Sequence, residues 1–325
     1  MKAVFYEEFG PPEVLQIGQR PVPQAAADEV LVQVVAAGVN PIDRRLRNGE
    51  LQDFFQRQWP IIPGWDVAGR IVQVGRDVTG WKAGDEIAGL AFVWTLRHGS
   101  YAEYVPVKAA SIARKPPGLS FPEAAALPLV SLTAWEALAE YAHLQPGQSV
   151  LIQAGAGGLG GAAIPIAKHL GATVYTTTRA DNFYYVRERG ADHAIDYTQT
   201  DYVEYLRQHE PLGVDAVIES LSDASAVDNA IRLVRPGGTV AYMNNEPPDT
   251  PAIAERNIQS KFLHHRPDGA SLARLLDLYA QGTLPLPQIE VMPLEDAVEA
   301  HRRSESGRVR GKLVLHVRPQ HDPGV

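Results

Sequence analysis

The middle of the chain, from about residue 120 to 265, alternates short β-branched runs with longer stretches that predict helices. The predicted strands are 150–153, 173–178, 193–196, 216–219 and 239–243, and the predicted helices are 123–127, 131–141, 182–189, 202–209 and 224–234. Strands that alternate with helices in this way form a parallel sheet covered on both faces. This region is therefore predicted to be a doubly wound α/β domain.

Both ends of the chain have a different pattern. Before residue 120, short β-branched runs are separated by Gly, Pro and Asp turns, which is typical of a β-rich domain. After residue 265, two predicted helices, 270–281 and 293–303, precede a last strand, 312–317, which we expect to rejoin the N-terminal strands. The sequence thus predicts two domains, one made of residues 1–120 plus 266–325 and the other of residues 121–265.

A glycine cluster separates the first two strands of the α/β domain, at positions 155, 157, 158, 160 and 161. Strand, glycine turn, helix and strand is the order of a dinucleotide-binding βαβ unit. Glycine permits the tight turn and leaves no Cβ between the backbone N–H groups and a pyrophosphate. The spacing is A-x-x-G-x-x-G rather than the full G-x-G-x-x-G, so a turn that only packs a helix on a strand is the alternative.

The end of the second strand indicates which dinucleotide binds. A site for NAD usually carries Asp or Glu there, which binds the ribose 2′-OH. In this chain the place is held by Thr177, Thr178 and Arg179, and the first carboxylate is Asp181. A guanidinium complements a 2′-phosphate, so the predicted cofactor is NADPH. The alternative is that Arg179 is a solvated loop residue.

Composition limits the function classes. The net charge of −8 argues against nucleic acid as a partner, because phosphate binding requires a basic face. There is no cysteine, hence no disulfide and no thiolate metal site. Residues 149–167 lack charges, but their glycines and Pro165 fit a nucleotide-binding turn better than a membrane helix. We expect a soluble, cytoplasmic protein without a membrane segment.

Several short segments, in order along nearly the whole chain, form a more specific pattern. They are A-G-V-N-P-I-D at 37–43, P-G-W-D-V-A-G at 63–69, G-D-E-I at 84–87, L-T-A at 132–134, the turn at 154–160, G-A-D at 190–192, I-D-Y at 195–197, P-G-G at 236–238 and G-R-V-R-G-K at 307–312. Together they resemble the zinc-independent quinone oxidoreductases of the medium-chain dehydrogenase/reductase superfamily. The resemblance implies a doubly wound Rossmann domain inserted in a β-rich GroES-like catalytic domain, with a cleft between them.

The resemblance also implies which residues form the site. The residues facing the cofactor would be Thr133 near the nicotinamide, Ala154, Gly157, Gly158, Leu159 and Gly160 along the pyrophosphate, and Thr178 and Arg179 at the 2′-phosphate. Asn40 and Asp43 would be the catalytic residues that line the substrate and nicotinamide pocket. Zinc-dependent relatives place a ligand cysteine where Asn40 stands and a ligand histidine where Trp65 stands, so no metal is expected.

The chemistry follows from the expected lack of a metal. Nothing in the sequence offers the carbonyl polarisation that a Lewis acid supplies, so a plain ketone would be a poor substrate. A quinone or enone spreads the incoming charge by conjugation, and ordinary hydrogen-bond donors then suffice. The predicted function is NADPH-dependent, metal-free hydride transfer to a quinone or another α,β-unsaturated carbonyl. The alternatives are a 2-enoyl-thioester or alkenal reductase, and a non-catalytic NADPH-binding sensor or structural protein.

The last part of the α/β domain predicts the oligomeric state. Ile258, Phe262 and Leu263 would give the outer strand an apolar edge, and a bare apolar edge favours association. A homodimer through residues 258–264 is therefore expected, in agreement with the resemblance.

Overall fold

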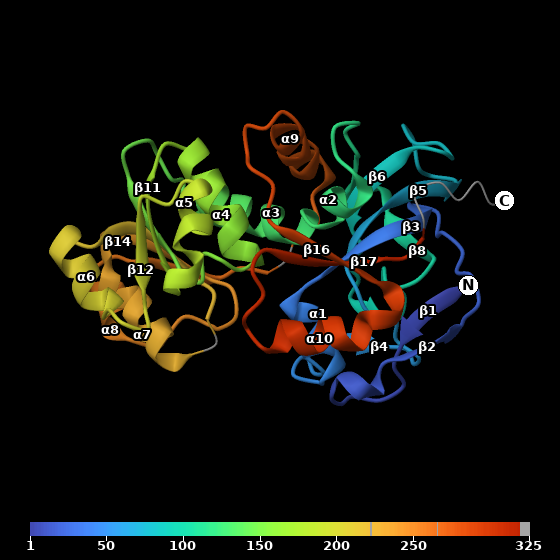
Figure 1. The fold of residues 1–325 in the computed structure, drawn as a ribbon, viewed down its shortest axis with the longest axis horizontal. Helices are drawn as coiled ribbons and strands as arrows, with labels where there is room; N and C mark the ends of the chain where they lie inside the picture. Colours follow the sequence, from blue (N-terminus) through green and yellow to red (C-terminus); the bar gives the residue numbers. More distant parts are fainter. Residues whose placement is uncertain (222, 265, 319–325) are drawn as a thin grey trace. The chain divides into compact units, whose positions relative to one another are not determined.

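The computed structural model describes residues 1–221, 223–264 and 266–318, which form two compact units (Figure 1). The first, here named the β-rich unit, comprises residues 1–129, 267–282 and 286–318. The second, the Rossmann unit, comprises the described residues between 130 and 266, together with 283–285. Each unit is described by itself below.

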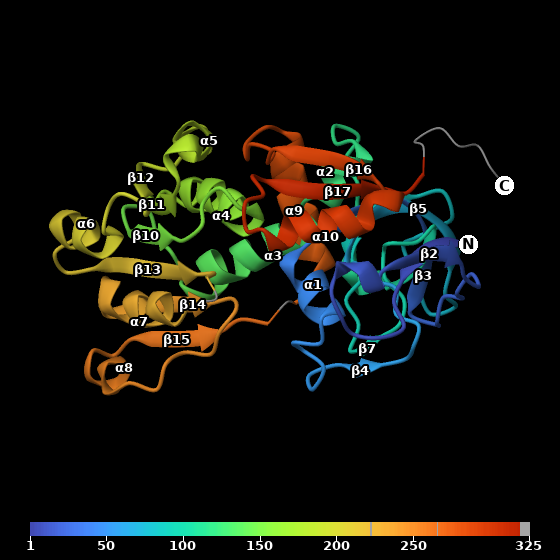
Figure 2. The same cartoon turned by 60° about the horizontal axis from the view of Figure 1, so that its bottom comes forward.

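Six parallel strands form the sheet of the Rossmann unit. They are β10 (Ser149–Ile152), β11 (Thr173–Thr178), β12 (His193–Asp196), β13 (Val214–Glu219), β14 (Val234–Tyr242) and β15 (Gln259–Phe262). Their order in the sheet is β12-β11-β10-β13-β14-β15 (Figure 2). This is the doubly wound arrangement that the sequence predicts. The winding reverses between β10 and β13, and ligands of such sheets bind at the carboxyl ends of the strands beside that reversal.

Helices connect these strands. They are α3 (Pro128–Trp135), which continues as the π-helix η3 (Glu136–Tyr141), then α4 (Gly158–His169), the 3-10 turn η4 (Ala180–Asn182), α5 (Phe183–Glu188), α6 (Tyr202–His209), α7 (Ala224–Leu233) and α8 (Pro251–Glu255). Leu206 on α6 and Ile231 on α7 belong to a buried cluster with Leu151, Val217 and Val240 of the sheet. The helices are thus held by the burial of one apolar face against the strands.

The β-rich unit is built on a second sheet. Its strands are β3 (Glu29–Val39), β5 (Asp66–Val74), β6 (Glu86–Leu90), β8 (Tyr104–Lys108), β9 (Ile112–Arg114), β16 (Ile289–Pro293) and β17 (Lys312–His316). The order is β16-β17-β3-β5-β6-β9, and β8 also pairs with β3. Because β17 lies antiparallel to β3, with Leu313 opposite Val39, the predicted return of the last strand to the N-terminal strands is confirmed.

Two small ladders and several helices complete the β-rich unit. The ladders join β1 (Lys2–Phe5) to β2 (Gln16–Gln19) and β4 (Gln56–Arg57) to β7 (Thr95–Leu96). The helices are α1 (Pro41–Arg47), α2 (Phe121–Ala125), α9 (Gly269–Ala280) and α10 (Ala297–Glu305), with 3-10 turns η1 (Pro12–Val14), η2 (Ala109–Ser111) and η5 (Leu294–Asp296).

Helix α2 belongs to the β-rich unit, whereas the sequence places it at the start of the α/β domain. Ser120 and Glu123 cap its first turn reciprocally, as their spacing predicts. Ala124 and Ala125 are buried where α2 packs on β3 and β5. A Cβ on Gly38 of β3 would lie 2.5 Å from the carbonyl oxygen of Ala125, so this close packing requires glycine there. The change of unit therefore falls at residue 129 rather than 120.

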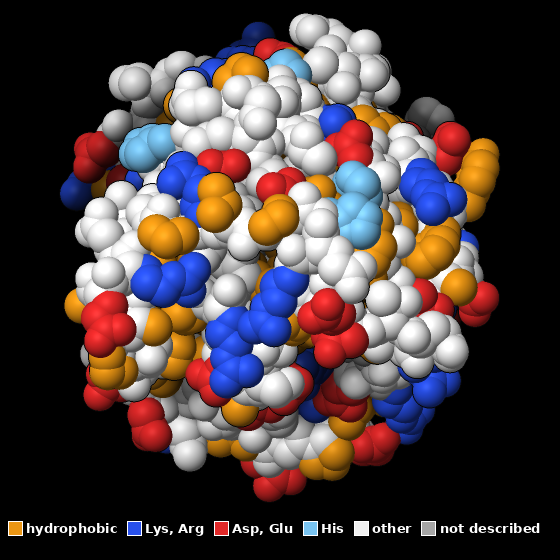
Figure 3. All heavy atoms as spheres, turned by 90° about the vertical axis from the view of Figure 1, so that its left-hand side faces the viewer, with side chains coloured by type: hydrophobic (Ala, Val, Ile, Leu, Met, Phe, Trp, Pro, Cys, Tyr) orange, Lys and Arg blue, Asp and Glu red, His pale blue; other side chains and the backbone are white. Residues whose placement is uncertain are grey.

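The surface charges and the hydropathy of the helices bear on the predicted partners. Acidic and basic side chains are interspersed over the face of the molecule shown in Figure 3, which has no continuous basic stripe. Among the described helices, none combines the length and the apolar composition that a bilayer-spanning segment needs.

Candidate functional site

The glycine turn between β10 and α4 lies at the carboxyl end of β10, beside the reversal of the sheet. Ala154 adopts a left-handed conformation (φ 53°), and its carbonyl oxygen accepts a hydrogen bond of 2.9 Å from the Gly157 N–H. A Cβ on Gly155 would lie 2.0 Å from Thr176 Oγ1, and one on Gly160 would lie 2.5 Å from Ala154 O. Packing therefore accounts for Gly155 and Gly160. It does not account for Gly157, whose nearest contact would be 3.4 Å away.

The start of α4 presents backbone N–H groups that have no hydrogen-bond partner within the helix. Gly157 is the N-cap residue, and no side chain of the described chain caps this end. The first-turn amides, those of Gly158, Leu159 and Gly160, precede the first intrahelical bond, which Gly161 donates to Gly157 O. Uncapped amides and a positive helix end suit a pyrophosphate, so the predicted residues fit that group.

The end of β11, the strand beside β10, carries the basic residue. Thr178 is buried at its last position, whereas the Arg179 side chain that follows is exposed. Arg179 Nε donates to the hydroxyl oxygen of Tyr197 at 3.3 Å. A hydrogen bond raises the already high pKa of the guanidinium, and the carboxylates of Asp181 and Asp196 contribute in the same direction. A guanidinium that remains positively charged thus lies at the carboxyl edge of the sheet.

Two further residues of the Rossmann unit, Thr133 and Glu219, are buried. Thr133, the predicted nicotinamide neighbour, is 8% exposed on α3. Glu219, which the sequence did not single out, ends β13 and is fully buried. Its carboxylate accepts bonds from Leu221 N at 2.7 Å and Asn245 Nδ2 at 3.3 Å, and it thereby ties together the loops after β13 and β14. Burial raises the pKa of Glu219 to about 7, although both hydrogen bonds act in the opposite direction.

In the β-rich unit, Asn40 belongs to a buried network with two residues that the sequence left without a role. Asn40 Nδ2 donates to Asp66 Oδ2 at 2.9 Å, and Lys312 Nζ donates to Asn40 Oδ1. Lys312 Nζ also lies 3.3 Å from Asp66 Oδ2, and the two side chains are 3% and 0% exposed. The backbone N–H of Leu129 donates to the other Asp66 oxygen at 2.7 Å. The Asn40 amide is therefore fixed in one orientation.

Asp43 lies in the first turn of α1 and is fully buried. Its Oδ2 accepts bonds from the Asn40 N–H at 2.8 Å and from the Tyr101 hydroxyl at 3.3 Å, whereas Oδ1 has no hydrogen-bond partner. Burial raises the pKa of Asp43 from its ordinary value of 3.8 to about 7. The neighbouring Asp66 carboxylate also raises it, while the hydrogen bonds and the Lys312 ammonium lower it.

A second buried group adjoins Tyr101. The rings of Tyr101 and His301 lie edge to face at 5.8 Å, and Arg47 Nη1 contacts His301 Nδ1 at 3.1 Å. Arg47 also pairs with Glu305 on α10. Burial lowers the pKa of His301 to about 3, helped by the positive charges of Arg47 and Arg44. This imidazole is therefore neutral at physiological pH.

The donor set does not fit a catalytic zinc ion. Asn40 and Trp65 are poor replacements for the cysteine and histidine that zinc favours. Lys312 already brings a positive charge against Asn40 and Asp66, so a divalent cation at this place would meet a like charge. Within the described ranges, no group of three His, Asp or Glu side chains is placed to bind a metal.

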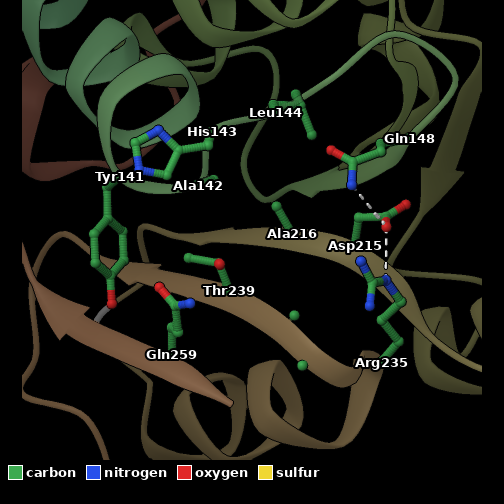
Figure 4. A pocket seen from close by; sticks show the side chains of 12 residues that line it. Tyr141, Ala142, His143, Leu144, Gln148, Asp215, Ala216, Arg235, Thr239 and Gln259 are labelled. Carbon is green, nitrogen blue, oxygen red and sulfur yellow. Dashed lines mark hydrogen bonds and ion pairs between the residues drawn. The ribbon is translucent and has the colours of Figure 1, made fainter. Parts of the chain in front are cut away.

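A pocket of about 200 Å³ in the Rossmann unit lies away from this edge (Figure 4). Its lining includes Gln148, Asp215, Arg235 and Gln259, all near the amino ends of their strands. Asp215 accepts bonds from Arg235 Nε at 2.6 Å and Gln148 Nε2 at 3.2 Å, so its charge is satisfied internally. Because cofactors bind at carboxyl ends, we assign this pocket no part in cofactor binding.

Comparison with known proteins places the chain. Two family models match: the alcohol dehydrogenase GroES-like domain over residues 26–117 and the zinc-binding dehydrogenase over residues 189–315. The 2-methylene-furan-3-one reductase of Solanum lycopersicum is 34% identical over 98% of this chain and 80% of its own length. The chloroplastic NADPH-dependent alkenal/one oxidoreductase of Arabidopsis thaliana is 32% identical over the same shares. The solved quinone oxidoreductase of Coxiella burnetii is 33% identical, with a TM-score of 0.87 over 98% of this chain and 99% of that one.

The second family model is named for zinc, but the buried Asn40, Asp66 and Lys312 side chains do not form a suitable zinc donor set at this place. The two relatives, in contrast, match along nearly the whole chain, and the solved structure shares its fold. The chain therefore belongs to the quinone oxidoreductase-like family of the medium-chain dehydrogenase/reductase superfamily.

Proposed function

We propose that this protein is an NADPH-dependent oxidoreductase that reduces a quinone or another α,β-unsaturated carbonyl compound without a metal. The observation that carries the proposal is the match along 98% of the chain to reductases named for furanone and alkenal/one substrates. The acceptor gains a hydride and one proton, so that a quinone becomes a hydroquinone and an enone a saturated ketone, while NADPH is oxidised to NADP⁺.

The Rossmann unit would hold the cofactor. Ala154, Gly157, Gly158, Leu159 and Gly160 form the turn and helix start that suit the pyrophosphate. Arg179 and the preceding Thr178 would face the 2′-phosphate, with Arg179 forming the ion pair. Thr133 would lie near the nicotinamide. When bound, NADPH supplies the hydride.

The β-rich unit would hold the acceptor. Asn40 has one amide hydrogen beyond the bond to Asp66, and Lys312 fixes the orientation of the amide. We propose that this hydrogen donates to the acceptor oxygen, on which negative charge develops during reduction. Asp43 would act as a positioning residue, since its carboxylate holds the backbone N–H of Asn40. Conjugated acceptors suit such a site because neutral donors suffice for them.

A panel of acceptors tests the function. We expect NADPH oxidation with 1,4-naphthoquinone and but-3-en-2-one, and none with the saturated ketone butan-2-one. Each assay is repeated after exhaustive chelation, which is expected to leave the rates unchanged. NADPH binding without turnover of any acceptor would favour the non-catalytic alternative, and loss of activity to a chelator, restored by zinc, would contradict the metal-free mechanism.

The cofactor assignment makes a sharper prediction. Replacing Arg179 with alanine is expected to weaken NADPH binding roughly ten- to hundredfold, because a charge-assisted contact to phosphate is lost. NADH affinity is expected to change little, since NADH has a hydroxyl in place of the phosphate. Binding of both cofactors is measured by titration calorimetry at two salt concentrations, and the wild-type preference for NADPH is expected to shrink as salt rises.

Arg207→Ala is the matched control for this experiment. Arg207 is an exposed arginine near the end of α6, which leads toward the amino ends of the strands, away from the Arg179 edge. Its loss should leave both affinities unchanged. Parallel losses for NADPH and NADH in Arg179→Ala would show that Arg179 only supports the loop, and a wild type that prefers NADH would overturn the assignment.

A homodimer and a cytoplasmic location are also proposed. The predicted apolar edge is not present as such, because Ile258 and Leu263 are buried and Phe262 is half-buried against the core of the Rossmann unit. What remains open is the backbone of β15, which ends the sheet and pairs with β14 alone among the described strands. An open backbone edge can pair with a second copy. The cytoplasmic location rests on composition, and the Arabidopsis relative is chloroplastic.

A further inference from the structure

Four aromatic side chains of the β-rich unit pack together near the start of β5: Phe55, Trp65, Phe92 and Trp94, here named the aromatic cluster. The rings of Phe55 and Trp94 are stacked, with centroids 5.7 Å apart and planes 25° apart. Phe92 meets Trp65 at 5.0 Å and Trp94 at 5.1 Å, edge to face in both cases. The cluster thus combines both geometries that aromatic pairs prefer.

The backbone holds these rings in place. Phe55 and Trp94 directly precede β4 and β7, and these strands pair in parallel with Gln56 opposite Thr95. The Gln56 N–H donates to Trp94 O at 3.1 Å, and the Gln58 N–H donates to Leu96 O at 2.9 Å. The cluster is therefore built before any ligand arrives, and binding to it needs little ordering of the loops.

The cluster is buried at one end and exposed at the other. Trp65 is 3% exposed, Phe55 and Phe92 are half-buried, and Trp94 is 64% exposed. Phe54, the neighbour of Phe55, is also exposed. A tryptophan that only completed a core would turn its ring inward, whereas an exposed aromatic patch marks a binding surface.

The cluster adjoins, along the chain, a residue of the polar network around Asn40. Trp65 directly precedes Asp66, which holds the Asn40 amide. The Ala91 N–H donates to Trp65 O at 2.6 Å, which attaches the segment carrying Phe92 to the same place. Aromatic rings and a fixed hydrogen-bond donor thus lie at the same end of β5, the combination that small-molecule sites commonly use.

We propose that the aromatic cluster is the subsite for the ring of the acceptor, so that the protein favours ring-bearing acceptors, such as bicyclic quinones, over short acyclic enones. The inference rests on the proposed function and specifies its substrate class. A planar, electron-poor ring can stack on the exposed face of Trp94, with its carbonyl oxygen directed toward Asn40. A short acyclic enone offers no ring to stack and gains nothing from the cluster.

The test compares 1,4-naphthoquinone with but-3-en-2-one in the wild type and in Trp94→Ala. The Trp94→Ala variant is expected to raise the KM for 1,4-naphthoquinone roughly three- to tenfold and to leave the KM for but-3-en-2-one unchanged. Trp94→Phe, which keeps a ring, is expected to recover most of the loss. Trp81→Ala removes a tryptophan of the same unit outside the cluster and is expected to change neither constant.

Calorimetric binding of 1,4-naphthoquinone without NADPH separates this inference from the proposed function. The chain has no cysteine, so the quinone has no thiol to alkylate. If the wild type reduces neither acceptor but binds the quinone in a Trp94-dependent manner, the inference holds and the proposed function fails. The inference is overturned if the wild type does not bind the quinone. It is also overturned if Trp94→Ala affects both acceptors equally or neither, as a protein-docking role of the cluster would require.

Discussion

Replacing Lys312 with methionine is expected to lower the free energy of unfolding of the β-rich unit by about 3–5 kcal/mol. Methionine matches much of the volume of the lysine stem but removes the ammonium. Asp66 would then keep its bonds from Asn40 Nδ2 and Leu129 N, but its negative charge would be buried without a positive partner. An uncompensated buried charge is among the few single changes that destabilise a domain this strongly.

The measurement must report on the β-rich unit alone, because a chain of two units need not unfold in one step. Four tryptophans, Trp59, Trp65, Trp81 and Trp94, lie in the β-rich unit, and Trp135 lies in the Rossmann unit. In a Trp135→Phe background, tryptophan fluorescence during urea unfolding therefore follows only the unit that contains Lys312.

Two further variants test the cause. Asp66→Asn combined with Lys312→Met removes both charges. The double variant is expected to lose less unfolding free energy than the sum of the losses in the two single variants. Lys108→Met, which breaks an ion pair at the exposed start of β3, is expected to have a much smaller effect. A Lys312→Met variant as stable as the wild type, or strict additivity in the double variant, would show that the pair is not the source of the stability.

The Asp66–Lys312 pair also shows which features can be predicted from a single sequence and which cannot. The strands β11 and β12 occupy the predicted residues 173–178 and 193–196, because each is a local β-branched or apolar run bounded by turn residues. The glycine turn is equally local and was predictable for the same reason. Asp66 and Lys312, however, are separated by 246 positions, and only the pairing of β17 with β3 brings them together.

A signal for the pair was nevertheless present. Asp66 opens a strand whose next three residues are all buried, and a carboxylate in such a place requires a cation or several donors. The sequence gives no indication of which of 30 lysines and arginines supplies the charge. For the same reason, the sequence does not predict to which unit α2 belongs. Its capping residues determine where the helix begins but not the sheet on which it packs. The same reason applies to Ile258 and Leu263, whose apolar character does not distinguish an exposed edge from their own core.

The second large effect concerns pH. The pKa of Asp43 in the folded protein is about 7, against an ordinary value of 3.8. Between these values the folded state binds a proton that the unfolded state releases, so stability falls as pH rises from about 4 to about 7. His301 acts in the opposite sense, because its folded pKa of about 3 lies below the ordinary 6.5, and its contribution is lost as pH falls through that range.

Asp43→Asn isolates the contribution of Asp43. The variant keeps an oxygen to accept from the Asn40 N–H but cannot ionise. The difference in unfolding free energy, variant minus wild type, is therefore expected to rise by up to about 4 kcal/mol between pH 4 and pH 7, and His301 cancels from it. A constant offset is expected as well, because Asp43 Oδ1 has no hydrogen-bond partner and an NH₂ group placed there would be left unsatisfied. The change with pH, rather than the offset, is the quantity to measure.

The same comparison in a Lys312→Met background provides the stricter test. The Lys312 ammonium lowers the pKa of Asp43, so its removal is expected to raise that pKa further. In this background, the difference in unfolding free energy between the variants with and without Asp43→Asn should keep rising above pH 7. The same difference measured against the wild type has levelled off at that pH. Urea unfolding at half-unit steps from pH 4.5 to 8.5, followed by fluorescence in the Trp135→Phe background, gives both curves. Curves that are flat with pH would show that Asp43 is ionised throughout this range. Curves that level off together would show that Lys312 does not act on it.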